Sequence, residues 1–112
     1  MELVVEEGPA GVTQAALIGR MDIDGAREIE QPFNVLTRLR RALVVDLSQV
    51  SFMASMGLRT LMVGARNQTE LGGRLVLAGP QPNVEKVLKE SGIGEIIGVY
   101  PSVEAAAAAI TA

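Results

Sequence analysis

The chain has 112 residues, with 10 Lys and Arg against 13 Asp and Glu, a formal net charge of −3, and neither His nor Cys. A chain of this length fits one domain that buries enough surface to fold without a metal or a disulfide. Without His or Cys it cannot form a Ser-His-Asp triad, a Cys-His nucleophile, a thiolate site or a zinc site of the usual kind. We therefore expect no enzyme, no metal and no other cofactor.

The same composition bears on location and partners. Residues 1–7 lack the basic region and long apolar stretch of a secretory signal, and no apolar run approaches the ~20 residues that span a bilayer. The absence of Cys fits a reducing compartment, so we expect a cytoplasmic protein that does not bind membranes. One Tyr, two Phe, no Trp and mild acidity argue against nucleic acid as a partner.

The first third of the chain predicts a hairpin and then a helix. The β-rich runs Leu3 to Glu6 and Val12 to Ile18 are separated by turn-forming residues at 8–11. Apolar residues at spacings of three and four then predict a helix over about 25–40. Pro32 lies inside this helix and removes a backbone donor, so we expect a kink or a break near Gln31.

The middle of the chain predicts a central strand, a loop and a second helix. The apolar run at 42–47 is typical of a strand covered by helices on both faces, and residues 48–54 are expected to form a loop. The next helix, at about 55–71, has an expected apolar face and ends before Gly72, which can adopt the left-handed conformation. That face consists of Leu58, Leu61, Met62 and Ala65.

The last third continues the alternation of strands and helices. It predicts a strand at 74–78, a helix from Pro82 to Gly92, a short strand at 96–99 and a final helix through Ile110 capped by Ser102. The order predicts a single α/β domain over residues 1–112 with a mixed, mostly parallel sheet of four to five strands and about four helices. One edge of that sheet is antiparallel.

The segment from Asp46 to Leu58 leads from the central strand into the second helix. The carboxyl ends of strands are where open α/β sheets usually place function, and Ser55 is the hydroxyl at this position. One interpretation is structural: Ser55 is the N-cap of the helix and accepts a hydrogen bond from the N–H of Gly57 or Leu58. Ser48 and Ser51 are further hydroxyls, of which Ser51 is expected to be a turn residue.

The second interpretation of Ser55 comes from a resemblance. Asp46-Leu47-Ser48 and Phe52-Met53-Ala54-Ser55-Met56-Gly57-Leu58, with Gly19-Arg20-Met21-Asp22 upstream and Gly72-Gly73 downstream, resemble the STAS domain of bacterial anti-sigma factor antagonists. The resemblance covers nearly the whole chain. It implies a protein whose unmodified form binds an anti-sigma factor that is also a serine kinase, and thereby releases a sigma factor. Phosphorylation of the serine that matches Ser55 ends the binding, and a phosphatase restores it.

The chain departs from the resembled loop, which reads roughly Phe-Met-Asp-Ser-Ser/Thr-Gly-Leu, at two positions. Ala54 stands where the family has Asp, and Met56 stands where it has a second hydroxyl residue. If the Asp assists the kinase, Ala54 makes Ser55 a poorer substrate. The alternative function is therefore an unmodified STAS module that serves as a scaffold or sensor part in a larger signalling complex.

The expected partner-binding residues surround Ser55, and each has a structural alternative. Met53, Ala54 and Met56 could form an adaptable apolar contact, although the two methionines could equally pack in the core. Gly57 could permit close approach of a partner, or it could avoid a collision within the fold.

Charged and aromatic neighbours carry weaker signals. Arg59 and Arg66 could meet an acidic partner or simply be solvated. The resemblance implies that Asp22 lies near the phosphoserine loop, where it could repel a phosphate or contact the kinase, and the alternative is a helix cap shared with Asp24. Phe52 is expected in the core. A small-molecule site has little support, because no glycine pair here opens a helix after a strand with phosphate-loop spacing.

Overall fold

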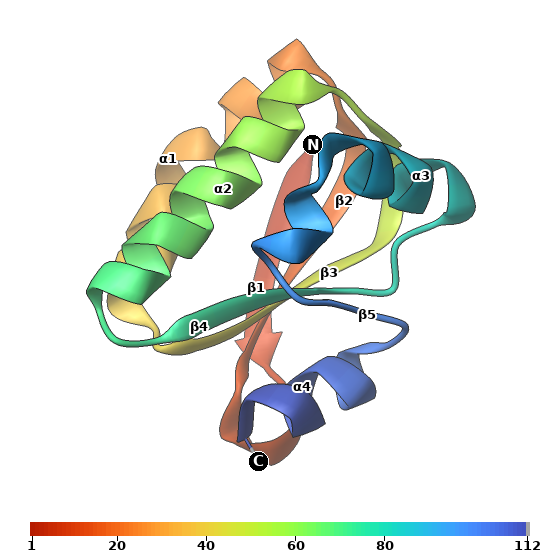
Figure 1. The fold of residues 1–112 in the computed structure, drawn as a ribbon. Coiled ribbons are helices and arrows are strands. Elements are labelled where there is room, and N and C mark those ends of the chain that lie inside the picture. Colours follow the sequence, from red (N-terminus) through yellow and green to blue (C-terminus); the bar gives the residue numbers. More distant parts are fainter. Residues whose placement is uncertain (112) are drawn as a thin grey trace.

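A five-stranded sheet with helices on both faces forms the fold in the computed structural model, which describes residues 1–111 (Figure 1). The strands lie in the order β1 (Glu2–Glu7), β2 (Thr13–Met21), β3 (Ala42–Met53), β4 (Arg74–Ala78) and β5 (Val99–Tyr100). β1 pairs antiparallel with β2, and the other pairs are parallel. The predicted α/β architecture, with β3 at its centre and an antiparallel edge, is confirmed.

Three helices cover one face of the sheet and the fourth covers the other (Figure 1). α1 (Ile23–Leu39), α2 (Ser55–Glu70) and α3 (Pro82–Ser91) pack on the larger cluster of buried side chains, whereas α4 (Val103–Thr111) packs on the smaller one. Two short 3-10 turns, η1 (Pro9–Gly11) and η2 (Ile93–Glu95), connect elements. Alternating side chains of β3 and β4 enter the two clusters, which explains the continuous apolar runs.

Of the kink or break expected near Gln31, the break is wrong. α1 runs from Ile23 to Leu39 through Pro32. Pro32 is exposed, so the carbonyl that it leaves unpaired one turn earlier faces water. Buried Ile29 and Phe33 hold the helix to the core on either side of the proline.

The loop expected at residues 48–54 is also wrong, because β3 continues to Met53. It stays paired with β2 through two shifts of register, which begin at Ala16/Ile18 and at Gly19/Arg20. Because the pairing is irregular, buried and exposed residues do not alternate strictly along this segment, and its polar sequence resembles that of a loop. The strand expected at 96–99 overlaps β5 only at Val99, and η2 precedes it.

The helix ends follow the predicted residue types. Gly72 and Gly92 adopt positive φ angles of 75° and 77° after α2 and α3. The N–H of Ala105 donates to Ser102 Oγ at 3.1 Å, which confirms the cap of α4. These turns return the chain to the sheet at defined points.

A buried amide connects α1 to α2. Gln68 Nε2 donates to the carbonyl oxygens of Thr37, at 2.6 Å, and of Arg40, and Asn67 Nδ2 donates to Thr37 Oγ1 at 3.0 Å. The carbonyls at the end of a helix have no partner within the helix, so Gln68 supplies one from its neighbour. This contact fixes how α2 lies beside α1.

Candidate functional site

Two neighbouring strand ends form the candidate site. Met21, the last residue of β2, lies opposite Met53, the last residue of β3. The N–H of Ala54 donates to the carbonyl oxygen of Met21 at 3.0 Å. Asp22 and Ser55, each of which follows one of these strands, therefore lie at the same edge of the sheet, the carboxyl edge where open α/β sheets place function.

Ser55 is the first residue of α2 and is exposed. The N-cap is Ala54, in an extended conformation with φ −109° and ψ 175°, and its carbonyl oxygen accepts from the N–H groups of Gly57 and Leu58 at 2.9 and 3.2 Å. The interpretation of Ser55 as the capping residue is therefore wrong, because Ser55 is already inside the helix and the N-cap is the residue before it. Within residues 1–111, no hydrogen bond engages the Ser55 hydroxyl.

Asp22 is the N-cap of α1. Its Oδ1 accepts from the N–H of Gly25 at 2.8 Å, and its Oδ2 lies 3.6 Å from Arg20 Nε. The hydrogen bond from Gly25, followed by the nearby Arg20 charge, holds the pKa of the Asp22 carboxyl below its usual range. Of the two carboxylates considered for this cap, Asp22 makes the bond and Asp24 lies exposed in the first turn.

Two expected contact residues lie inside the fold. Met53 is only 3% exposed and belongs to the main core. A Cβ added at Gly57 would lie 2.5 Å from Met53 Sδ and 2.8 Å from Met21 Cγ, so this glycine lets α2 pack against the strand ends. Both residues support the surface from beneath and do not present a side chain to a partner, which corrects the expected contact set.

Phe52 lies at the surface, not in the core. It is 37% exposed, and the Arg20 guanidinium carbon lies 4.5 Å from the centre of its ring. Phe52 and Arg20 are opposite each other on β3 and β2. Since Met53 points inward, its neighbour on the strand points outward. This alternation would have identified Phe52 if β3 had been extended to residue 53.

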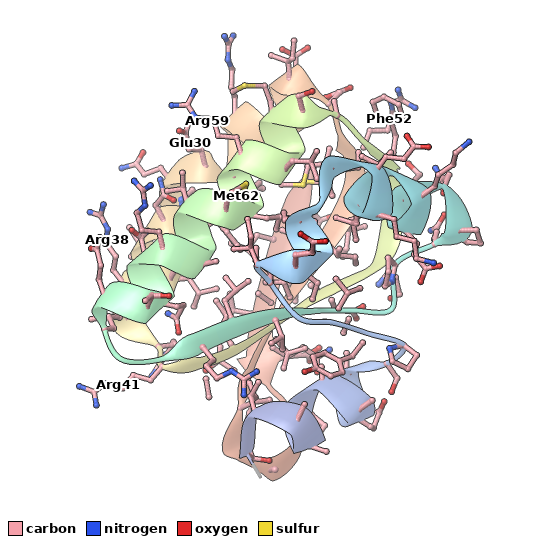
Figure 2. All side chains as sticks on the ribbon, in the orientation of Figure 1. Glu30, Arg38, Arg41, Phe52, Arg59 and Met62 are labelled. Atoms are coloured by element: carbon pink, nitrogen blue, oxygen red, sulfur yellow. The ribbon has the colours of Figure 1, made fainter. Side chains whose placement is uncertain are left out.

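The members of the site that reach the surface form what we call the Ser55 surface: the exposed Ile23, Phe52 and Ser55 and the half-buried Ala54 and Met56. Ile23 opens α1, is 53% exposed, and was not identified from the sequence. Met56 is half-buried. The surface is mostly apolar, and Figure 2 shows Phe52 and Arg59 at the end of the molecule where β3 leads into α2.

Arg59 and Arg66 are exposed on α2, and Met62 is 43% exposed although it was expected on the buried face. The rest of the expected face does turn inward: Leu61 is buried, and Leu58 and Ala65 are half-buried against the main core. The buried residues of α2 are Gly57, Thr60, Leu61, Gly64, Asn67 and Gln68. Ser55, Arg59, Met62 and Arg66 line one groove of about 640 Å³ on the outer side of the helix. The Ser55 surface therefore continues along α2.

The two other hydroxyls have structural neighbours. Ser51 is a residue of β3 and not of a turn, which corrects the expectation, and its Oγ lies 3.5 Å from the carbonyl oxygen of Gly19. Side-chain amides of Gln81 and Asn83 donate to the carbonyl oxygens of Ser48 and Ser51 at 2.9 and 2.8 Å. These bonds hold the start of α3 against β3.

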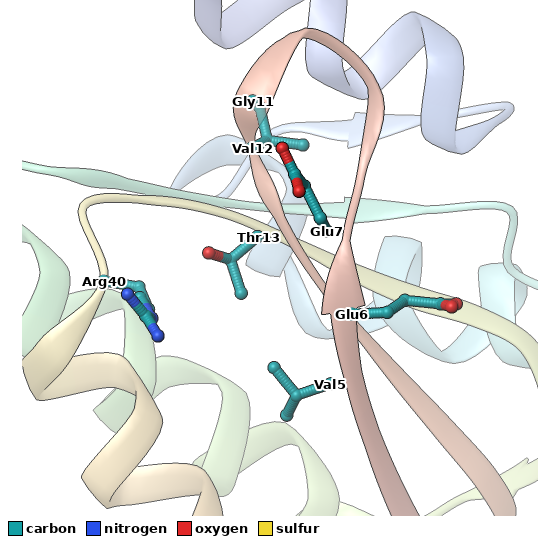
Figure 3. A pocket seen from close by; sticks show the side chains of 7 residues that line it. All are labelled: Val5, Glu6, Glu7, Gly11, Val12, Thr13 and Arg40. Carbon is teal, nitrogen blue, oxygen red and sulfur yellow. The ribbon is translucent and has the colours of Figure 1, made fainter.

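A separate hollow of about 390 Å³ lies where β1 turns into β2 (Figure 3). Its lining includes Val5, Glu7 and Thr13, with Arg40 facing it from the end of α1. Thr13 begins β2, so the hollow is at the opposite end of that strand from Asp22 and holds none of the expected site residues.

The described part of the chain, residues 1–111, contains no group of three His, Cys, Asp or Glu side chains that could hold a metal ion. None of the helices in that range is long and apolar enough to cross a bilayer.

Comparison with known proteins identifies the class. The sequence model of the STAS domain family matches residues 4–106. BtrV of Bordetella bronchiseptica, described as an anti-sigma factor antagonist, is 33% identical over 100 residues, which are 88% of this chain and 86% of that protein.

Solved structures show the same fold. An anti-sigma factor antagonist from Mycobacterium paratuberculosis superposes with a TM-score of 0.89 at 25% identity, covering 99% of this chain and 94% of that one. The Bacillus cell fate determinant SpoIIAA in its phosphorylated form superposes with a TM-score of 0.66 at 21% identity, covering 88% and 90%. The chain belongs to the STAS domain family and, within it, to the anti-sigma factor antagonists. These are regulatory binding proteins, not enzymes.

Proposed function

We propose that the unmodified chain binds an anti-sigma factor with serine kinase activity through the Ser55 surface, and that this binding releases a sigma factor. The observation that carries the proposal is the exposed, uncommitted hydroxyl of Ser55 at the start of α2, beside the capping carboxylate of Asp22. A serine that caps a helix would be explained by the fold, and this one is not. Its surroundings are apolar and at least partly exposed, which suits the central part of an interface.

Phosphorylation of Ser55 is the proposed switch. A phosphate adds about −1.5 to −2 charges near pH 7, and at the first residue of α2 it lies at the positive end of the helix dipole. The fold therefore tolerates it. In a complex, the same charge would be pressed against Phe52, Met56 and the apolar surface of the partner.

The cost of that burial decides whether the switch works. Burying the phosphate against an apolar partner surface that offers no cation costs at least several kcal/mol, and each 1.4 kcal/mol weakens binding about tenfold. One phosphate is enough to abolish a micromolar complex. A serine phosphatase would restore the binding form, and we place the cycle in the cytoplasm, where sigma factors act.

A second function is favoured by one residue. Ala54 stands where the resembled loop has Asp, and it offers α2 no side-chain cap. If that carboxylate is needed by the kinase, the chain acts as a STAS module that binds without being modified, as a scaffold or sensor part of a larger complex.

Incubation with an anti-sigma factor kinase and ATP, followed by intact-mass measurement and peptide mapping, separates the two functions. Addition of one phosphate at Ser55 supports the switch, and the Ser55→Ala variant should bind the kinase without gaining mass. Stable binding with no gain of mass supports the scaffold. Phosphate at Ser48 or Ser51 in place of Ser55 would contradict the proposed site.

A further inference from the structure

The outer face of α2 carries a straight stripe of exposed side chains. Ser55, Arg59, Met62, Arg66 and Thr69 follow one another at spacings of four, three, four and three, and all are exposed. Such spacing keeps side chains on one line along a helix. From the first to the last residue the stripe is about 21 Å long, which is about four helical turns.

Beside the stripe lies an apolar groove. Leu58 and Ala65 are half-buried and pack against the main core, so they form its floor. Ile96, which follows η2, lines the same groove and is 68% exposed, so it adds an apolar side chain to the wall of the groove. We call this hollow of about 640 Å³ the α2 groove, and Figure 2 shows Met62 on the outer side of the helix that borders it.

The charge of the α2 groove is opposite to that of the protein. Its lining includes Arg59 and Arg66 and no carboxylate, although the chain has a net charge of −3. The ion pairs found among residues 1–111 involve other side chains. An apolar floor with a basic rim is complementary to a helix that has an apolar seam flanked by Asp and Glu.

We propose that the α2 groove binds an acidic amphipathic helix of the partner protein, and that a phosphate on Ser55 closes the groove by pairing with Arg59. The second half rests on the proposed function, since it requires Ser55 to be modified. The first half does not, because the groove and its arginines belong to the unmodified chain.

Helix geometry brings the phosphate to Arg59. Residues four apart on a helix have Cβ atoms about 5–6 Å from each other, and an acid placed N-terminal to a base at this spacing is the favourable order. Guanidinium and phosphate form paired, charge-assisted hydrogen bonds. Glu30 of α1 shares a smaller hollow with Arg59, but the phosphate carries more charge and more acceptors.

Pairing of Arg59 with the phosphate would weaken the binding of an acidic helix in two ways. It would withdraw Arg59 from the rim, and it would place net negative charge at the head of the groove. Arg66, eleven residues beyond Ser55 and about 16 Å along the axis, stays available. The switch would therefore weaken binding most strongly at the end of the groove nearest Ser55.

The first test uses the unmodified chain and a synthetic helical peptide of 15 residues, with Leu along one seam and Glu on its flanks. We expect backbone amide shifts in NMR spectra along α2 and at Ile96, and no binding of a matched peptide with Lys in place of Glu. Arg66→Glu should weaken the acidic peptide at least about tenfold. Arg27→Glu, an exposed arginine of α1 outside the groove, is the matched control. Equal binding of both peptides, or shifts centred elsewhere, would contradict the proposal that the α2 groove binds an acidic helix.

The second test uses phosphoserine incorporated at residue 55 during translation. A nearby cation favours the doubly ionised phosphate, so its second pKa, near 6 in a free phosphoserine, should be lowered and should rise by about half a unit or more in Arg59→Gln. Other charges near Ser55, those of Arg20, Asp22 and Glu30, are the same in both proteins and cancel in the comparison. Titration by ³¹P NMR measures the difference.

The phosphorylated chain should also bind the acidic peptide at least about tenfold more weakly than the unmodified chain, and Arg59→Gln should remove most of that difference. An unchanged phosphate pKa in Arg59→Gln would overturn the pairing even if a kinase modifies Ser55. Because the phosphoserine is installed without a kinase, failure of the proposed function leaves both tests valid.

Discussion

The N–H of Ala54 donates to the carbonyl oxygen of Met21 at 3.0 Å, and this one bond joins the two strand ends from which α1 and α2 begin. It sets Asp22, the cap of α1, and Ser55, the first residue of α2, at one edge of the sheet. The two residues differ in how they are used. The carboxylate of Asp22 is engaged by the fold, whereas the hydroxyl of Ser55 is left exposed.

A charge at residue 55 should therefore change binding and not folding. Ser55→Asp places a carboxylate at the favourable end of the helix dipole, so we expect a melting temperature within about 2 °C of the parent chain. Affinity for the anti-sigma factor should fall tenfold or more, measured by calorimetry or surface plasmon resonance. Ser51→Asp, at another exposed hydroxyl on β3, is the control for charge alone. Unfolding of Ser55→Asp with no specific loss of affinity would contradict the switch.

Placing the acidic residue of the resembled loop at position 54 should stabilise the N-terminus of α2. Ala54 has N-cap geometry without a side-chain acceptor, so Ala54→Asp should stabilise the chain by about 1 kcal/mol in urea unfolding. Ala54→Glu is the matched control, since it adds the same charge with a poorer capping side chain. If the carboxylate also assists the kinase, Asp but not Glu should raise the rate of phosphorylation. No gain in stability from Asp over Glu would show that residue 54 is not a cap.

Gly57 should prove to be a packing residue. A Cβ there would meet Met53 Sδ and Met21 Cγ, and a larger side chain must displace both of these buried methionine side chains. Gly57→Val should cost at least about 2 kcal/mol of unfolding free energy. In Gly94→Val the added Cβ has its nearest neighbour at 4.0 Å, and the change should be below about 0.5 kcal/mol. A loss of affinity in Gly57→Val without a loss of stability would show that Gly57 acts in partner binding and not in packing.

The hydrogen bonds from the Gln68 amide of α2 to the end of α1 can be tested by substitution. Gln68→Met keeps the length of the side chain but leaves the carbonyls of Thr37 and Arg40 without this donor, which should cost about 1–3 kcal/mol. Gln31→Met, at an exposed position of α1, should stay within about 0.5 kcal/mol of the parent chain. Urea unfolding compares the two, and equal stability would mean that water replaces the amide at little cost.

How far the sequence predicts this structure depends on the range of the interactions involved. The ends of α2 and α3 at Gly72 and Gly92, and the cap at Ser102, follow from local chemistry and are predicted correctly. The last six residues of β3 are missed, because they are strand only through irregular pairing with β2, which no local pattern reveals.

That single error propagates into the site. Ending the strand at residue 47 makes 48–54 a loop and removes the alternation that turns Phe52 outward and Met53 inward. It also moves the helix cap from Ala54 to Ser55. The resemblance located the right segment, but which side chains are free there is decided by the contact between β2 and β3, and this required the structure.

Asp22 gives the site a measurable dependence on pH. Its pKa is lowered in the folded protein, first by the hydrogen bond from the Gly25 N–H and then by Arg20, while the unfolded chain should titrate near the ordinary value of about 3.9. The ionised form therefore favours the folded state. Its contribution is complete above the unfolded pKa and is lost as the pH falls through the lowered folded pKa.

Asp22→Asn keeps an oxygen that can accept from Gly25 but does not titrate in this range. We expect the parent chain to be more stable than Asp22→Asn at pH 6 and to lose that advantage as the pH falls below about 4. Urea unfolding of both proteins at several pH values measures the difference, in which all other carboxylates cancel. Because the exposed Arg20 charge is screened by salt and the Gly25 bond is not, most of the difference should persist in high salt. Parallel curves for the two proteins would show that the carboxylate has no preferential interaction in the folded state, and that Asp22, like Ser55, is free to act on a partner.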